Sequence, residues 1–271
     1  MFRADLHCHS TMSDGTFTPR ELLVHAKEIG LSGISITDHD TVDAYLEAPQ
    51  IAKKLGLKLG CGAEFSCTFK EMSVHLLAYD FDLKSAPIRE LCQRHQERRV
   101  ERNRIILEKL SRLSMPVFEE ELQRFGARTV GRPHIALLMI EKGYVSSIRD
   151  AFQRYLGDDK PCYYPGKTIS VEETIQIIHQ SSGKAFIAHP HLLEGASKIR
   201  ELVKLPIDGI ECHYARFTPN QEKRWIKIAD EKGLLKSGGS DFHGKMKDYI
   251  SLGCSWVDEE TFNQIFERPL A

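Results

Sequence analysis

The sequence contains no apolar run approaching the roughly 18 residues of a membrane-spanning helix. Its seven cysteines are odd in number and form no Cys-x-x-Cys pair, which argues against a disulfide framework and against a thiolate zinc site. It has no excess of positive charge, with 37 Lys and Arg against 38 Asp and Glu, so binding of nucleic acid through overall charge is excluded. The polar, histidine-rich start predicts no secretory leader, and we expect a cytoplasmic protein with reduced cysteines.

The composition is that of a folded globular protein. Of the 271 residues, 41% are hydrophobic and 28% are charged, which excludes a disordered chain. A chain of this length holds one large domain or two small ones. Residues 84–167 carry 17 Lys and Arg against 11 Asp and Glu, whereas the remainder carries 20 against 27. This asymmetry reflects either solvated helix faces or a middle segment that presents cations to an anionic substrate.

Helix signals are clearest at two capping boxes and in the middle of the chain. Thr18-Pro19-Arg20-Glu21 and Thr218-Pro219-Asn220-Gln221 each predict the start of a helix. Residues 87–113 are charged and have helical periodicity, and shorter helices follow to about residue 156. This helical stretch interrupts a regular alternation of strands and helices.

The strand signals predict six or seven βα units and therefore a parallel sheet, closed or partly closed. We expect an α/β barrel domain made of residues 1–83 and 166–271, with a helical insertion at 84–165 as a substrate-capping subdomain. The predicted strands are Arg3–His7, Gly33–Thr37, Leu57–Glu64, Ser73–Tyr79, Lys184–Ala188, Asp208–Cys212 and Leu234–Gly238.

Each predicted strand carries His, Asp or Glu at or near its end, where the reactive groups of βα barrels lie. His7 and His9 point to the same side of an extended segment, because side chains alternate along a strand. A single strand-end histidine is usually a surface residue, but so many on one rim favour a site for Zn, Mn or Fe. The segments are Asp5-Leu6-His7-Cys8-His9, Asp38-His39-Asp40, Glu64, His75, Ala188-His189-Pro190, Glu211-Cys212-His213 and Ser240-Asp241-Phe242-His243.

These segments resemble the motifs of the PHP (polymerase and histidinol phosphatase) family. The resemblance begins at Asp5-Leu6-His7-Cys8-His9-Ser10, continues through Ser13-Asp14-Gly15, and covers nearly the whole chain. In the insertion, Gly131-Arg132-Pro133-His134 and Gly143-Tyr144-Val145 resemble the TrpH-like branch of small phosphoesterases. The other matching motifs are Thr37-Asp38-His39-Asp40, Gly62-Ala63-Glu64, Val74-His75-Leu76, Ala188-His189-Pro190 and Ser240-Asp241-Phe242-His243.

The resemblance implies a distorted (β/α)7, TIM-like barrel with a site for two to three divalent ions (Mn, Fe or Zn). It assigns three ligand sets, of which the first two share Glu64. These sets are His7, His9, Glu64 and Asp241 for the first ion, Glu64, His75 and His189 for the second, and Asp14, His39 and His243 for the third. The sequence departs from the branch at His191, where a small residue is frequent.

Such a site hydrolyses phosphate esters because the ions clamp the phosphoryl oxygens and turn a bound water into hydroxide near neutral pH. The resemblance implies in-line attack by this metal-bound hydroxide. Asp38 and Asp40 are expected to orient His39 or other ligands. Capping of the following helix is an equally good role for Asp40.

Arg132 and His134 are the candidates for binding a second phosphate, since Arg suits bidentate phosphate contacts. Alternatively, Arg132 simply opens a helix as a solvated residue. Arg216, in a loop after a strand end, is a weaker third candidate.

The sequence thus predicts a metal-dependent phosphoesterase acting on phosphate esters of nucleotides or short RNA ends. The resemblance favours a 3′,5′-bisphosphonucleotide or a 5′-phosphorylated oligonucleotide, single-stranded RNA included, and no membrane or obligate protein partner is expected. Histidinol phosphate is the alternative substrate, and an amidohydrolase is the alternative enzyme. Asp241-Phe242-His243 counts against the amidohydrolase, and the complete ligand set counts against a non-catalytic PHP module.

Overall fold

The computed structural model describes residues 1–126, 129–193 and 195–271. The chain divides into two compact units, each described separately below. The first unit comprises residues 1–92 and 169–271, and the second comprises residues 93–168. No helix in the described ranges is both long and apolar enough to cross a bilayer.

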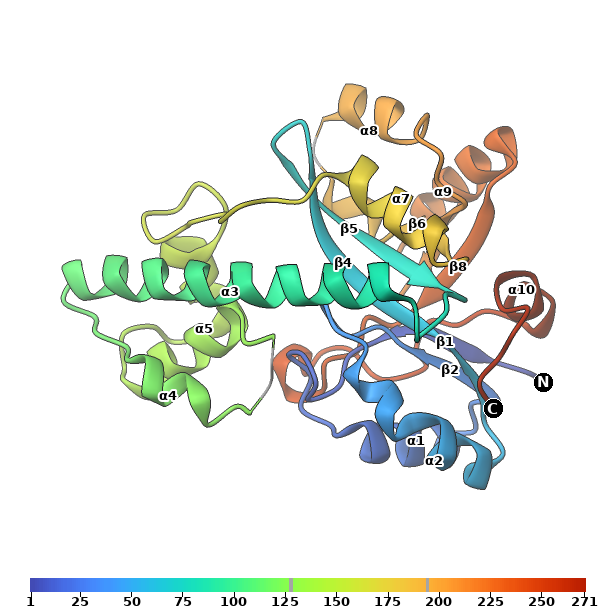
Figure 1. The fold of residues 1–271 in the computed structure, drawn as a ribbon, viewed down its shortest axis with the longest axis horizontal. Helices are drawn as coiled ribbons and strands as arrows, with labels where there is room; N and C mark the ends of the chain where they lie inside the picture. Colours follow the sequence, from blue (N-terminus) through green and yellow to red (C-terminus); the bar gives the residue numbers. More distant parts are fainter. Residues whose placement is uncertain (127–128, 194) are drawn as a thin grey trace. The chain divides into compact units, whose positions relative to one another are not determined.

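The first unit contains two β-sheets (Figure 1). One has the order β1-β2-β3 and is parallel throughout. The other has the order β4-β5-β6-β7-β8 and is mixed. The strands are β1 (Ala4–Cys8), β2 (Gly33–Ile36), β3 (Lys58–Gly60), β4 (Gly62–Phe69), β5 (Met72–Tyr79), β6 (Lys184–Ile187), β7 (Gly209–Tyr214) and β8 (Leu235–Gly239).

The prediction of an all-parallel sheet is wrong at β5, which runs antiparallel to both β4 and β6. Lys70 and Glu71 form a two-residue turn between β4 and β5, with φ of 48° and 69°. Two positive φ values at the centre of a short turn produce a hairpin, and a hairpin joins antiparallel strands. The turn lacks the Asn-Gly or Asp-Gly sequence that usually marks such a hairpin.

The predicted strand 57–64 is in fact two strands in different sheets. The Tyr45 hydroxyl lies at the break between them, 2.9 Å from Gly60 O and 2.7 Å from Gly62 N. Its hydrogen bonds with the backbone on both sides of the break replace the hydrogen bonds between strands at this point. The chain therefore leaves one sheet at β3 and starts the other at β4.

Isolated bridges link the two sheets, pairing Cys8 with Phe242 and His39 with Glu64. Asp241 N donates to His7 O at 2.7 Å next to the first bridge. Both bridges therefore lie beside predicted metal ligands. The first unit is a mixed α/β fold with parallel strands, covered by helices.

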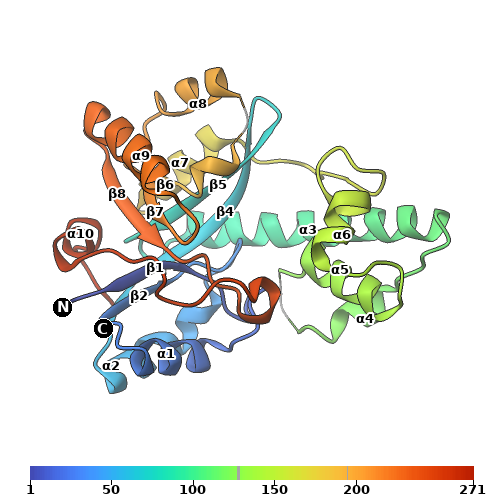
Figure 2. The same cartoon turned by 180° about the vertical axis from the view of Figure 1, so that it is seen from behind.

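Two helices of the first unit begin at the capping boxes expected from the sequence. The α1 N-cap is Thr18 in a capping box with Glu21, and α9 begins in the same way at Thr218 with Gln221. In Figure 2, α1 and α2 lie together beside β1 and β2. The helices are α1 (Pro19–Glu28), α2 (Ala48–Leu55), α7 (Val171–Gln180), α8 (Ala196–Leu202), α9 (Pro219–Lys232) and α10 (Glu259–Ile265), with 3-10 turns at Asp43–Leu46, Pro190–Leu192 and Gly244–Lys247.

The second unit is helical in its described residues and has a core of its own. Ile106 and Leu110 of α3 pack with Ile135 and Met139 of α5 in one apolar cluster. The first turns of α3 belong to the first unit. The elements are α3 (Ala86–Arg112), α4 (Glu119–Gln123), α5 (Arg132–Glu141), α6 (Ile148–Ala151) and a π-helical turn at Phe152–Leu156. The role of this segment as a substrate cap remains a prediction.

Candidate metal centre

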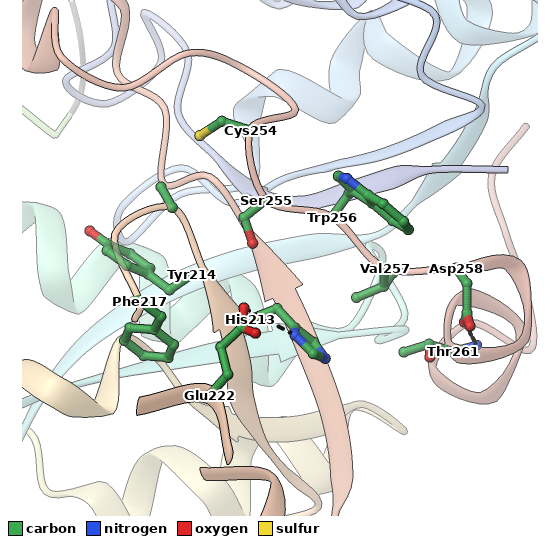
Figure 3. Close-up of a pocket in the computed structure, with 11 residues that line it drawn as sticks. His213, Tyr214, Phe217, Glu222, Cys254, Ser255, Trp256, Val257, Asp258 and Thr261 are labelled. Atoms are coloured by element: carbon green, nitrogen blue, oxygen red, sulfur yellow. Dashed lines mark hydrogen bonds and ion pairs between the residues drawn. The ribbon is translucent and has the colours of Figure 1, made fainter. Parts of the chain in front are cut away.

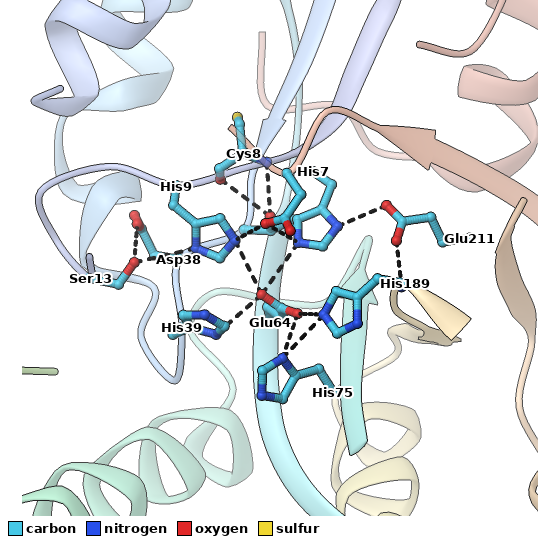
Figure 4. Close-up of polar contacts among 12 residues, drawn as sticks. His7, Cys8, His9, Ser13, Asp38, His39, Glu64, His75, His189 and Glu211 are labelled. Atoms are coloured by element: carbon cyan, nitrogen blue, oxygen red, sulfur yellow. Dashed lines mark hydrogen bonds and ion pairs between the residues drawn. The ribbon is translucent and has the colours of Figure 1, made fainter. Parts of the chain in front are cut away.

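The end of β1 supplies the first two histidines of a buried polar cluster (Figure 4). His7 and His9 are both fully buried, and their ring centres lie 5.3 Å apart. The alternation of side chains along the strand places both rings on the same side, as the sequence predicts. The apolar neighbours Leu6 and Cys8 point to the opposite side, into two different cores.

Glu64 of β4 is the centre of this cluster, and both of its carboxylate oxygens contact imidazole nitrogens. Burial opposes the charged form of this carboxyl, but His39, His75 and His7 outweigh it and hold the pKa of Glu64 well below its usual range. Glu64 Oε2 lies 3.3 Å from His7 Nε2, 3.1 Å from His9 Nε2 and 3.1 Å from His39 Nδ1, and Oε1 lies 2.9 Å from His75 Nδ1 and 2.8 Å from His189 Nε2.

Asp241 and Asp14 complete the cluster on the side of His9. Asp241 Oδ1 is 3.5 Å from His7 Nε2 and 3.4 Å from His9 Nε2. Asp14 Oδ1 is 3.4 Å from His243 Nε2. The φ of Asp241 is 56°, in the left-handed region that non-glycine residues rarely adopt, so the backbone is held in a strained conformation at this ligand position.

The structure therefore brings together all nine residues that the sequence singles out as ligands. The possible ligand atoms form three sets, and within each set they lie no more than 4.8 Å apart. His39 and His9 each belong to two of these sets. The sets are His9, Asp14, His39 and His243; His7, His9 and Asp241; and His39, Glu64 and His75. His189 lies beside the third set through its contacts with Glu64 and His75.

The donor atoms have the spacing of a metal site. Two ligands of one ion, each about 2.1 Å from it, are roughly 3.0–3.4 Å apart at octahedral or tetrahedral angles. The Glu64 and Asp241 contacts with His7 and His9 are close to this range, at 3.1–3.5 Å. His9 Nε2 and His39 Nδ1 are buried, and their 3.1 Å contacts with Glu64 Oε2 do not have the geometry of a hydrogen bond. These residues fit divalent ions, which would satisfy the buried nitrogens.

The charges of the cluster also require cations. Burial disfavours the ionised carboxyls of Asp14 and Asp241, yet nearby histidines, with Lys247 at Asp241, hold the pKa of each well below its usual range. Burial lowers the pKa of His9, but the contacts with Asp241 and Glu64 raise it by more. The pKa of His9 is therefore raised to about 9. Several buried carboxylates thus share one small space, where histidines and Lys247 offset part of their charge and divalent ions would offset more when bound.

Glu211 of β7 orients two of the predicted ligands, a role the sequence did not assign. His7 Nδ1 lies 2.8 Å from Glu211 Oε1, and His189 N donates to Glu211 Oε2 at 2.5 Å. Because a carboxylate only accepts, His7 carries a proton on Nδ1 and directs Nε2 toward Glu64. The signal was a buried Glu at a strand end, a common partner of metal-bound histidine.

Tyr214 and Lys247 hold the second oxygen of Asp241. The Tyr214 hydroxyl donates to Asp241 Oδ2 at 2.8 Å, and Lys247 Nζ donates to the same atom at 2.6 Å. Oδ1 is thereby left facing His7 and His9. Nothing in the local sequence marks these two residues, because their contact with Asp241 depends on the fold.

Asp38 and Asp40 support the surroundings of the cluster. Asp38 accepts hydrogen bonds from Ser10 N at 2.7 Å and from Ser13 Oγ at 2.7 Å, so it fixes the loop that carries Asp14. Asp40 accepts from Ser66 N at 2.7 Å and Ser66 Oγ at 3.0 Å, which ties it to β4 two residues beyond Glu64. The next helical turn has no side-chain cap, so the capping role of Asp40 is wrong.

The predicted substrate-binding residues lie in both units. In the second unit, the Arg132 guanidinium bonds Leu156 O at 3.0 Å and Asp158 Oδ1 at 2.9 Å, and its side chain is 22% exposed. His134 is buried, and its Nδ1 accepts from Gly131 N at 3.1 Å. Arg216 lies in the first unit, stacked on a tyrosine ring. Whether these residues bind substrate stays a prediction.

His213, which the sequence left as rim lining, lies in a separate cavity of about 450 Å³ (Figure 3). Its Nδ1 is 3.5 Å from Glu222 Oε1, and Asp258 lines the same cavity. The two carboxylates make this cavity unsuitable for a phosphate group.

Comparisons with known proteins show the family to which this chain belongs. The family model of the PHP domain matches residues 5–157. The 5'-3' exoribonuclease Rnm of Escherichia coli (strain K12) is 32% identical over 98% of this chain and 94% of its own length. A 3',5'-nucleoside bisphosphate phosphatase of Chromobacterium violaceum is 28% identical over 90% of this chain and 88% of its own.

A solved structure agrees as well. The chain superposes on a protein from Bifidobacterium adolescentis, described as a metal-dependent phosphoesterase, with a TM-score of 0.88 and 32% identity. The match covers 97% of this chain and 94% of the other. The chain therefore belongs to the PHP domain family, and it is a hydrolase that acts on phosphate esters.

Proposed function

We propose that this chain hydrolyses phosphate esters of nucleotides or of short RNA ends at the cluster around Glu64. The observation that carries the proposal is the convergence of three His and carboxylate donor sets on one buried centre. The names of the relatives support the substrate class, since they include an exoribonuclease and a nucleoside bisphosphate phosphatase. The distorted (β/α)7 barrel of the family is the framework we propose for this centre.

Divalent ions, when bound, neutralise the phosphate and lower the pKa of water enough to provide a nucleophile near neutral pH. This chain's residues prepare that chemistry. Glu211 keeps a proton on His7 Nδ1, so that Nε2 is the nitrogen that would bind a metal ion. Tyr214 and Lys247 occupy Asp241 Oδ2, so that Oδ1 faces the centre. Asp38 holds the loop of Asp14 in place.

The cysteines near the cluster do not offer a competing nucleophile. Burial, with Asp5 and Asp38 nearby, raises the pKa of the Cys8 thiol well above its usual value. Burial also raises the pKa of Cys212 to about 12. Both groups stay protonated at neutral pH, and a thiol is a poor nucleophile. Hydrolysis through the metal centre is therefore the reaction that the residues support.

Arg132 and His134 in the insertion, 84–165, are the residues we propose for recognising a second phosphate of the substrate. Arg132 already bonds Asp158, so binding a phosphate would require it to exchange or share that partner. Its stacking on Tyr163, at 5.4 Å, keeps the guanidinium plane in place for such an exchange. In the first unit, Arg216 is the residue we propose for binding a phosphate of the substrate.

The test is phosphate release from a panel of esters by protein reconstituted with Mn, Zn or Fe. The substrates are adenosine 3′,5′-bisphosphate, a short 5′-phosphorylated RNA and histidinol phosphate. We expect one of the two nucleotide substrates to have the highest kcat/KM. A clear preference for histidinol phosphate would contradict the substrate class, and release of no phosphate from any of the three esters would contradict phosphate ester hydrolysis.

A further inference from the structure

Two segments of the first unit meet at Asp241 and then continue to the protein surface. The Tyr214 hydroxyl and Lys247 Nζ both donate to Asp241 Oδ2. Two residues beyond them along the chain are Arg216 and Tyr249. Since two residues span at most about 7 Å, the backbone of Arg216 and that of Tyr249 each lie within about 7 Å of the backbone of a residue that contacts Asp241.

Arg216 and Tyr249 form an exposed stacked pair. The guanidinium carbon of Arg216 lies 4.9 Å from the centre of the Tyr249 ring. Tyr249 is 64% exposed, so the guanidinium covers only part of the ring. Within the described residues, Arg216 makes no ion pair, and its side chain is exposed. An exposed aromatic ring beside an exposed arginine matches the surfaces that bind single-stranded nucleic acid.

More aromatic side chains continue this surface from Tyr214. The Tyr214 ring centre lies 5.4 Å from that of Phe217 and 4.7 Å from that of His191. His191 is the residue at which the sequence departs from the family branch. Tyr214 is buried, while Phe217 and His191 are half-buried, so the exposed parts of these two rings add flat area that does not read one particular base.

We propose that Arg216 and Tyr249 form a stacking subsite for the base of the nucleotide whose phosphate is hydrolysed. The base lies on the uncovered part of the Tyr249 ring, and the Arg216 guanidinium contacts a phosphate of the same nucleotide. This inference rests on the proposed function. It adds that the substrates are nucleotides of any base sequence, recognised by stacking rather than by base-specific hydrogen bonds.

The test compares Tyr249→Ala, Tyr249→Phe and Arg216→Ala on two substrates. One substrate is adenosine 3′,5′-bisphosphate, and the other is the abasic ribose 3,5-bisphosphate, which has the phosphates without the base. Tyr249→Ala should lower kcat/KM about ten- to a hundredfold for the nucleotide, the range expected for one stacked base. It should leave the abasic substrate unchanged, and Tyr249→Phe should retain the nucleotide activity. Arg216→Ala should weaken both substrates, because both carry the phosphate.

Arg224→Ala is the matched control, since Arg224 also stacks on an aromatic ring, 4.7 Å from the centre of Trp225 on α9. It should change neither substrate. A loss with Tyr249→Ala that is equal on both substrates, or absent on both, would overturn the subsite.

Binding of adenosine 3′,5′-bisphosphate to chelator-treated protein, measured by calorimetry, gives a readout without catalysis. Weaker binding to Tyr249→Ala than to the wild type supports the subsite, and equal binding contradicts it. A wild-type protein that binds the nucleotide but releases no phosphate from any ester would refute the proposed function and leave the subsite standing.

Discussion

In the first unit, buried histidines and carboxylates from several strands meet around Glu64, whereas the second unit includes charged pairs at its surface. Glu64 alone contacts five imidazoles. In the second unit, Arg132 pairs with Asp158 and Lys142 pairs with Glu121, at 2.9 and 2.8 Å. A cluster of buried carboxylates is costly unless cations neutralise it, while partly exposed pairs are nearly neutral in stability. The cluster around Glu64 therefore fits divalent ions, whereas these two pairs of the second unit are compensated locally.

The largest expected effect follows from removing the charge of Glu64. Glu64→Gln keeps the size of the side chain but removes the carboxylate that five imidazoles share. We expect bound metal to fall and kcat/KM to drop by about a thousandfold, since metal stabilisation of the transition state is worth several kcal/mol and each 1.4 kcal/mol is about tenfold. Metal content and phosphate release measure this.

Glu121→Gln in the second unit is the matched control for that change. Glu121 is a partly exposed partner of Lys142. It should keep its metal content and activity. If Glu64→Gln also kept both, Glu64 would not be the centre of the site.

A smaller loss is expected when an orienting residue is changed. Glu211→Gln weakens the bonds to His7 Nδ1 and His189 N without removing a proposed ligand. Metal affinity should fall about ten- to a hundredfold, as is typical when the partner of a metal-bound histidine is changed. Competition with a chelator measures the affinity. An unchanged affinity would show that the histidines keep their orientation without Glu211.

Most of the proposed ligands could be predicted from the sequence because they belong to short His and carboxylate motifs in or next to strands, whereas Asp14 was identified only through the resemblance to the family. His7 and His9 need only the alternation of a strand to face the same way. Tyr214, Lys247 and the hairpin at Lys70 could not be predicted. Tyr214 and Lys247 donate hydrogen bonds to Asp241, which is distant from Tyr214 in the sequence. The hairpin turn consists of Lys70 and Glu71, two residue types that favour no particular turn.

In the second unit, Arg132→Ala should affect recognition rather than chemistry. If Arg132 binds the second phosphate, the variant loses a charge-assisted bond worth about 1.5–3 kcal/mol, or about ten- to a hundredfold in kcat/KM. The loss should be confined to bisphosphorylated nucleotides and absent with p-nitrophenyl phosphate. Steady-state kinetics on both substrates measure it.

The two alternative outcomes for Arg132→Ala are informative. An equal loss on both substrates would mean that Arg132 contacts the reacting phosphate or stabilises the second unit. The second role is physically reasonable because Arg132 also donates to Leu156 O. No loss on either would return Arg132 to a surface role. Thermal unfolding of the variant separates a stability effect from a binding effect.

The smallest expected effect is that of a surface pair in the second unit. Lys142→Ala removes its bond to Glu121, and both side chains are partly exposed. The free energy of unfolding should change by no more than about 1 kcal/mol. Denaturant unfolding measures it. A much larger change would mean that charges in the second unit are as important for stability as those around Glu64.

The most direct test of a metal centre at Glu64 is anomalous diffraction from crystals of the manganese-loaded protein. We predict anomalous peaks within bonding distance of Glu64, with His7, His9, His39 and Asp241 among the contacting residues. Peaks found only at exposed carboxylates, with none in the buried cluster, would contradict the account.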